Sequence, residues 1–120
     1  MKAIKLFNIN GTDCSFQEGT LSELKHIHLQ HFFVQTNIEN YELVSHPAPR
    51  RQFVITLKGK LKFTVTNGDT FIIEPGVVLI ATDLLGKGHT WEIIEGNEWH
   101  RIYLVPELSA EDFFVPLESE

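Results

Sequence analysis

Short apolar segments separated by turn signals run along most of the chain. The segments are rich in Val, Ile, Thr and aromatic residues, and most end at an Asn-Gly, Lys-Gly or Pro-Gly pair, at Asn or at Pro. Segments of this length with such turns between them are typical of antiparallel strands. The pattern predicts strands at 2–9, 27–36, 53–57, 61–65, 70–74, 77–81, 90–94 and 101–105.

Helical signals are few and short in this sequence. Thr20 and Glu23 have the spacing of a capping box, and residues 109–112 could begin a terminal turn. No linker, repeat or low-complexity segment divides the chain, and 120 residues are enough for one domain. The sequence therefore predicts an all-β fold, an antiparallel sandwich or barrel, in a single domain spanning residues 1–120.

Composition and charge narrow the classes of partner. The net charge is −6, and the one basic cluster is Arg50–Arg51, so the chain should repel nucleic-acid phosphates. The longest strongly apolar segment, 77–81, is too short to cross a bilayer. A single cysteine, Cys14, fits a reducing compartment, and the N-terminal segment lacks the apolar region of a signal peptide. We expect a cytoplasmic protein that binds neither nucleic acid nor membranes.

The segment "HPAPRRQFVITLKG", residues 46–59, carries more polar chemistry than a strand needs. Side chains two apart on a strand share a face. If the chain is extended from the first proline, one face holds His46, Arg50, Gln52 and Thr56. A bulge at either proline would exchange Arg50 for Arg51 on that face. The segment therefore predicts a site with one of the two arginines in it.

This segment and the one after it resemble the two sequence motifs of the cupin superfamily. Gln52 and Gly59 have the spacing of the glutamate and glycine of the first motif, with His46 and Ala48 at its histidine positions. In the second motif, a Pro-Gly turn at 75–76 and a later histidine, His89, match across a longer gap. The resemblance covers residues 45–105 and is to small single-domain cupins of the RmlC-like type. It implies an antiparallel jelly-roll barrel.

Many cupins hold a divalent transition metal with three histidines and one glutamate. Here Ala48 and Gln52 stand at two of those positions, and His46 and His89 remain. Alanine cannot be a ligand, and an amide carbonyl is a weaker one than a carboxylate. Asp83, in the turn before His89, is either a surface turn residue or a carboxylate that completes a two-histidine, one-carboxylate set with His46 and His89, with Gln52 as the alternative third ligand. The metals that would suit such a set are Fe, Mn, Ni and Zn.

Each candidate side chain has more than one interpretation. His46 and His89 are hydrogen-bonded residues at the barrel mouth, metal ligands, or a catalytic acid and base, since an imidazole titrates near pH ~6.5. Arg50 and Arg51 either pair with surface carboxylates or hold the carboxylate or phosphate of a ligand. Trp91 shares a strand face with His89 and would form an aromatic wall beside it.

Two functions remain open at this point. The first is the binding of a small anionic metabolite in the barrel mouth, and we favour it because two metal positions are lost. The second is a metal-dependent cupin enzyme, a dioxygenase or isomerase, with His46 and His89 as the catalytic residues.

Three further features carry predictions about partners and reactivity. The aromatic segments "HFFV" and "DFFVP", at 31–34 and 112–116, predict a homodimer. His26 and His28 share a strand face, either as a solvated face or as a chelating pair. Cys14 shows no sign of activation and is expected to be packing.

Overall fold

The structure is a computed structural model and describes residues 1–117. Its regular structure is nearly all strand, with one short 3-10 helix, η1 (Asn40–Leu43), in the described part of the chain. The strands are β1 (Lys2–Asn8), β2 (Cys14–Leu21), β3 (Leu29–Gln35), β4 (Gln52–Thr64), β5 (Thr70–Ile73), β6 (Val78–Ala81), β7 (Thr90–Pro106) and β8 (Phe114–Pro116). The predicted β-rich class is confirmed.

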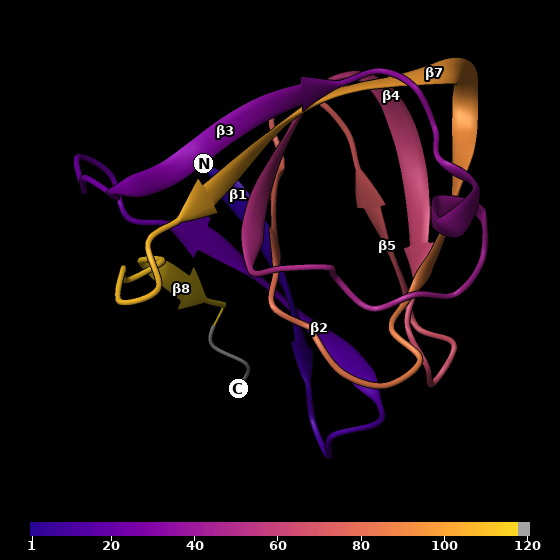
Figure 1. The fold of residues 1–120 in the computed structure, drawn as a ribbon, viewed down its shortest axis with the longest axis horizontal. Helices are drawn as coiled ribbons and strands as arrows, with labels where there is room; N and C mark the ends of the chain where they lie inside the picture. The colour runs from indigo at the N-terminus through magenta and orange to yellow at the C-terminus, as the bar shows by residue number, and fades with distance from the viewer. Residues whose placement is uncertain (118–120) are drawn as a thin grey trace.

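The strands form one curled sheet. Their order is β3-β7-β4-β6-β1-β2-β8, and β5 pairs with the C-terminal half of β4. Every pair is antiparallel except β1 with β6, which is parallel, so the sheet is mixed rather than purely antiparallel. Figure 1 looks into the curl, with β3 and β7 along its upper edge and β1 and β2 below; the sheet forms a half-barrel.

Two long neighbouring strands, β4 and β7, replace four predicted ones. The sequence segment 53–57 lies in β4, as does 61–65 except for its last residue, and 90–94 and 101–105 lie in β7. Gly59 adopts φ 118°, and a Cβ there would lie 2.6 Å from the carbonyl oxygen of Glu98 on β7. The pairing shifts register around this point. The glycine therefore bends the ribbon, as glycines at bulges do, instead of ending the strand.

The sequence pattern missed β2 and β8. Strand β2 contains Glu18 and Gly19, residue types that are depleted in strands. It is held by seven paired positions with β1, from Lys2–Thr20 to Asn8–Cys14. The predicted helix start at Thr20 is wrong, because Thr20 lies within β2. The predicted turn of helix at 109–112 is absent as well, and the chain there forms turns before β8.

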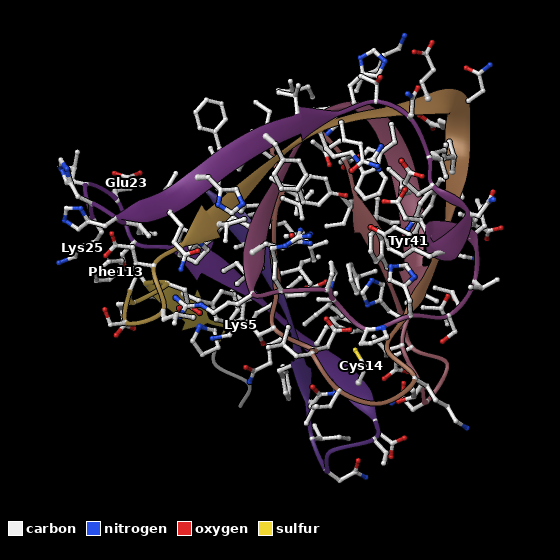
Figure 2. All side chains as sticks on the ribbon, viewed as in Figure 1. Lys5, Cys14, Glu23, Lys25, Tyr41 and Phe113 are labelled. Carbon is white, nitrogen blue, oxygen red and sulfur yellow. The ribbon has the colours of Figure 1, made fainter. Side chains whose placement is uncertain are left out.

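Alternation along the strands creates two apolar layers. Val54 belongs to the cluster inside the curl, with Leu6, Leu61 and Phe63, whereas its neighbour Phe53 belongs to a smaller cluster on the outside. Side chains from the 22–28 segment and from β8 cover part of that outer cluster. Figure 2 shows side chains gathered inside the curl, with Tyr41, which is 49% exposed, on η1. Among residues 1–117, no helix is long and apolar enough to span a membrane.

Candidate functional site

A narrow pocket lies inside the half-barrel. Its walls are largely apolar, with Val54, Phe63, Leu79 and Trp99 among them. Polar side chains reach it from η1, from the segment before β4 and from the sheet: Tyr41, Glu42, His46, Gln52, His89 and Tyr103. The enclosed space is small, about 30 Å³, which is room for about two waters. The lining has the chemistry of a small-molecule site, apolar with a few convergent polar groups, but the space is far smaller than the several hundred Å³ that such sites usually have.

The motif residues meet at this pocket. His46, Ala48, Gln52 and His89 all line it, and so does Trp91, whose ring packs edge-on against Trp99 at 5.0 Å. Thr56 is not a lining residue; its Oγ1 accepts a hydrogen bond from Trp99 Nε1 at 3.1 Å and so supports the wall from behind.

His46 and His89 are joined through their backbones. Each N–H donates to the other residue's carbonyl oxygen, at 3.1 and 2.9 Å, and the two rings lie 4.9 Å apart. Gly88 makes this approach feasible, since a Cβ at that position would lie 1.9 Å from His46 O. Two residues far apart in the sequence are thereby fixed side by side at the pocket.

Both imidazoles are held at Nδ1. His46 Nδ1 lies 2.8 Å from the carbonyl oxygen of Val44, and His89 Nδ1 lies 2.6 Å from Asp83 Oδ2. Carbonyl and carboxylate oxygens accept, so each ring donates from Nδ1. Neither Nε2 has a hydrogen bond within residues 1–117, and each can therefore offer a lone pair or take up a proton.

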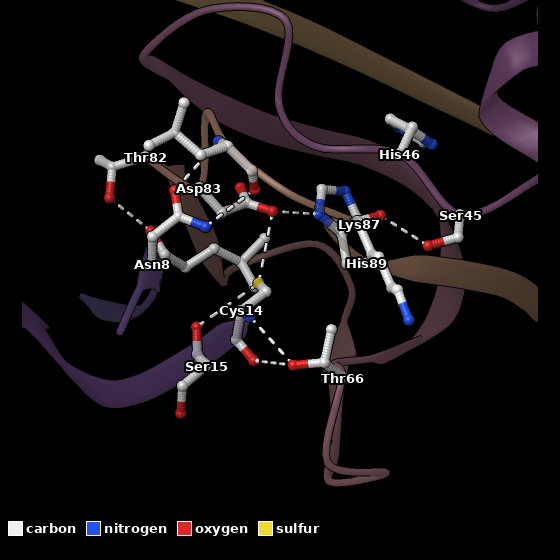
Figure 3. A network of polar contacts seen from close by, with 12 residues as sticks. Asn8, Cys14, Ser15, Ser45, His46, Thr66, Thr82, Asp83, Lys87 and His89 are labelled. Atoms are coloured by element: carbon white, nitrogen blue, oxygen red, sulfur yellow. Dashed lines mark hydrogen bonds and ion pairs between the residues drawn. The ribbon is translucent and has the colours of Figure 1, made fainter. Parts of the chain in front are cut away.

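Asp83 lies behind His89 rather than in the pocket. Its side chain is fully buried, and its Oδ2 accepts from His89 Nδ1 and, at 3.3 Å, from the thiol of Cys14 (Figure 3). Burial, reinforced by the Asp83 carboxylate, raises the pKa of the Cys14 thiol, which stays protonated at neutral pH. This contact joins residues 69 apart in the sequence, and the sequence reading treated Cys14 as packing alone.

The two arginines at the start of β4 point to different places. Arg50 Nη1 donates to Gln52 Oε1 at 2.9 Å, and its guanidinium lies over the Phe33 ring at 5.5 Å. Arg51 instead donates to the carbonyl oxygens of Leu108 and Ala110, away from the pocket. Within the described residues, neither arginine has a carboxylate within 4.0 Å.

A buried ion pair that sequence reasoning missed lies in the pocket wall. Arg101 Nη2 donates to Glu42 Oε1 at 2.9 Å, with both side chains nearly inaccessible to solvent. The guanidinium also donates to Trp99 O and Tyr103 OH and lies 4.3 Å above the Trp99 ring. The available signal was a charged residue between Trp99 and Tyr103 on one apolar strand face, which needs a buried partner.

The other histidines take no part in this pocket. His26 and His28 are exposed in the segment between β2 and β3, and His31 is exposed on β3. His100, on β7, pairs with Glu98 through Nε2 at 2.6 Å.

Comparison with protein-family models, with curated proteins and with solved structures found no match. The function is therefore argued from the geometry of the site itself.

Proposed function

We propose that this chain binds a small anionic molecule at the mouth of the half-barrel pocket, with Arg50 as its charged anchor. The observation that carries this proposal is the state of Arg50. Its guanidinium is positioned by Gln52 and Phe33, yet it has no carboxylate partner among residues 1–117, in a chain of net charge −6. An arginine fork with unused donors suits a carboxylate or phosphate.

The pocket chemistry supports the same proposal. Gln52 links Arg50 to the pocket, and His46 and His89 present Nε2 atoms that can donate once protonated. Trp91 adds an aromatic wall for the apolar part of a ligand. Because the enclosed space is small, the ligand is small or displaces the half-buried His46 side chain on entry.

The cupin-type jelly roll remains part of this proposal. Its support is local: Gly59 lies where a Cβ would meet the neighbouring strand, and Gly76 has φ 96° in the Pro-Gly turn between β5 and β6. Cytoplasmic location also remains a prediction, resting on the one buried thiol.

The proposal is tested by ligand-dependent melting. Inorganic phosphate and a panel of small mono- and dicarboxylic acids are titrated against the wild type, Arg50→Ala and Arg51→Ala. A ligand that binds only the folded state raises the melting temperature. We expect at least one acid to do so for the wild type and Arg51→Ala and to lose the effect with Arg50→Ala. The same shift in all three proteins would show that the arginines are not the anchor.

A second function, a metal-dependent enzyme such as a dioxygenase or isomerase, has one observation in its favour. His46 and His89 each donate from Nδ1 to an oxygen, which is how metal-binding histidines are usually oriented for coordination through Nε2. Gln52 would be a poor third ligand here, since its Oε1 already accepts from Arg50. A divalent metal bound by both Nε2 atoms would be lost with His46→Ala but not with Cys14→Ser.

A further inference from the structure

Three buried residues lie together behind the pocket, and the anion proposal uses only one of them, His89, through its Nε2 atom. Cys14 begins β2, Asp83 follows β6, and His89 precedes β7. Their exposed fractions are 1, 0 and 7%. One ligand atom from each, the sulfur, a carboxylate oxygen and a ring nitrogen, all lie within 4.8 Å of one another. Figure 3 shows the three side chains converging from separate segments of the chain.

The hydrogen bonding within this cluster is incomplete. Asp83 Oδ2 accepts both from His89 Nδ1 at 2.6 Å and from the Cys14 thiol at 3.3 Å. Asp83 Oδ1 is sealed from solvent and has no partner among the described residues. An unpaired buried carboxylate oxygen is costly, so it calls for a partner beyond the protein's own donors.

We propose that Cys14, Asp83 and His89 form a binding site for a divalent transition metal, with zinc as the ion that suits them best. Thiolate, carboxylate and imidazole are the ligand types that zinc takes, and three protein ligands leave a fourth position open. The thiolate and carboxylate together balance the charge of a divalent ion in a buried site. Zinc bonds of about 2.0–2.3 Å hold ligand atoms on the order of 3.5 Å apart. His89 Nδ1 and Asp83 Oδ2, now 2.6 Å apart, would therefore have to separate to admit the ion between them.

Metal binding at this site would release one proton from the protein. The Cys14 thiol releases one proton to solvent and coordinates as thiolate, and Asp83 coordinates as carboxylate. His89 coordinates through Nδ1, so its ring proton moves to Nε2. A neutral His89 therefore binds a metal either here through Nδ1 or in the pocket through Nε2, but not at both places. The proposed site and the two-histidine site considered above are mutually exclusive.

The backbone around the cluster is fixed in advance. Asn8 exchanges two hydrogen bonds with the backbone of Leu85, and Lys87 N donates to Thr12 O. Thr66 Oγ1 accepts from Cys14 N and donates to Cys14 O. The turn between Asp83 and His89 is thereby held against the start of β2. Cys14 and His89 each line a surface hollow, which gives the ion a way in.

The test uses cobalt(II) and zinc(II) on full-length protein purified without an affinity tag and stripped with a chelator. All proteins carry His26→Ala and His28→Ala to remove the exposed pair that could chelate a metal on its own. We expect one equivalent of cobalt to give a near-ultraviolet thiolate-to-cobalt charge-transfer band, with one proton released per zinc. Cys14→Ser should abolish the band and weaken zinc binding at least about tenfold, whereas His46→Ala should keep both.

Several results would overturn the site. The first is a folded wild type, by circular dichroism, with no thiolate-to-cobalt band at one equivalent. The second is equal zinc affinity in the wild type and Cys14→Ser. The third is loss of metal with His46→Ala and retention with Cys14→Ser, which would place the ion on the Nε2 side. If Cys14→Ser does not fold, the wild-type cobalt spectrum alone decides, since Cys14 is the one thiol in the chain.

Discussion

Two buried residues in the pocket wall form an ion pair. Arg101 and Glu42 are both inaccessible, and the guanidinium donates to Glu42, Trp99 O and Tyr103 OH. Glu42 in turn accepts from the backbone of Glu39. A buried ion pair is tolerated when both charged groups also have hydrogen-bond partners. Removal of one member of the pair leaves a buried charge without compensation.

Arg101→Met should lower the free energy of unfolding by about 3–5 kcal/mol, because Glu42 keeps its charge and loses its partner. The double variant Arg101→Met/Glu42→Leu should recover much of that loss. Urea denaturation measures both, with Lys62→Met as the control for an exposed pair, Lys62–Glu92. A single variant as stable as the control would show that the buried pair is not held as described.

At the residue scale, the sequence predicts part of the site. His46, Gln52, His89 and Trp91 were found because motif spacing and strand parity are local properties, and the structure brings all four to one pocket. The contacts of Asp83 with Cys14 and of Arg101 with Glu42 join residues 69 and 59 apart. No local pattern encodes such a pair, because it depends on how the strands are ordered in the sheet.

Among the elements, the turn between β6 and β7 positions the site. It carries Asp83 and His89 and packs closely on the segment around His46. Glycines at 86 and 88 have positive φ, and at both positions a Cβ would collide with backbone. The strands themselves were easier to predict than their ends, since apolar content marks a strand but a glycine can either bend or end it.

Gly88→Ala should destabilise the fold far more than Gly11→Ala. Both glycines have similar positive φ, 70° and 82°, so the backbone strain is matched. At Gly88 the new Cβ would also lie 1.9 Å from His46 O, whereas at Gly11 nothing lies within 4 Å. Thermal melting of the two variants measures the difference. Similar losses in both would mean that the close approach of His46 and Gly88 is not maintained in solution.

Asp112, just before β8, forms an ion pair with Lys5 on β1. Burial raises the pKa of Asp112, but hydrogen bonds from Lys5 Nζ and Phe114 N–H outweigh it and hold this pKa below its usual value. A carboxyl group whose pKa is lower in the folded than in the unfolded chain stabilises the fold at pH values above its unfolded-state pKa, about 3.9. This stabilisation is lost as the pH falls through the folded-state pKa.

Asp112→Asn should therefore be less stable than the wild type at pH 7, and the difference should close in acid, where the wild-type carboxyl is protonated. Its exposed neighbour supplies the control, since Glu111→Gln should match the wild type at both pH values. Denaturant titrations at the two pH values give the comparison. A deficit in Asp112→Asn that stays constant into acid would contradict the charge-based account.

An apolar surface on β3 is left open in the described part of the chain. Phe32 and Val34 on β3 are 66 and 70% exposed, and β3 ends the sheet order within the described residues. The other aromatic segment is used internally, because β8 pairs with β2 and Phe114 packs on the outer cluster. An exposed apolar edge of this kind is suited to a second copy of the chain.

We predict a homodimer through β3. Light scattering at micromolar concentration should return twice the chain mass of 13.8 kDa. Phe32→Asp should yield monomers, while Leu108→Asp, at an exposed position outside the strands, should not. A wild-type mass of one chain would exclude the dimer at that concentration.

The central claim, that Arg50 anchors an anion at the pocket, is tested most directly by NMR of side-chain nitrogens. The acid that most raises the melting temperature is titrated into the labelled protein, and the Arg50 and Arg51 Nε–H signals and the His46 and His89 ring signals are followed. We predict saturating shifts at Arg50 and at both histidines, with Arg51 unmoved. Shifts at Arg51 and not at Arg50, or no shift at either arginine when the acid is saturating, would contradict the proposed site.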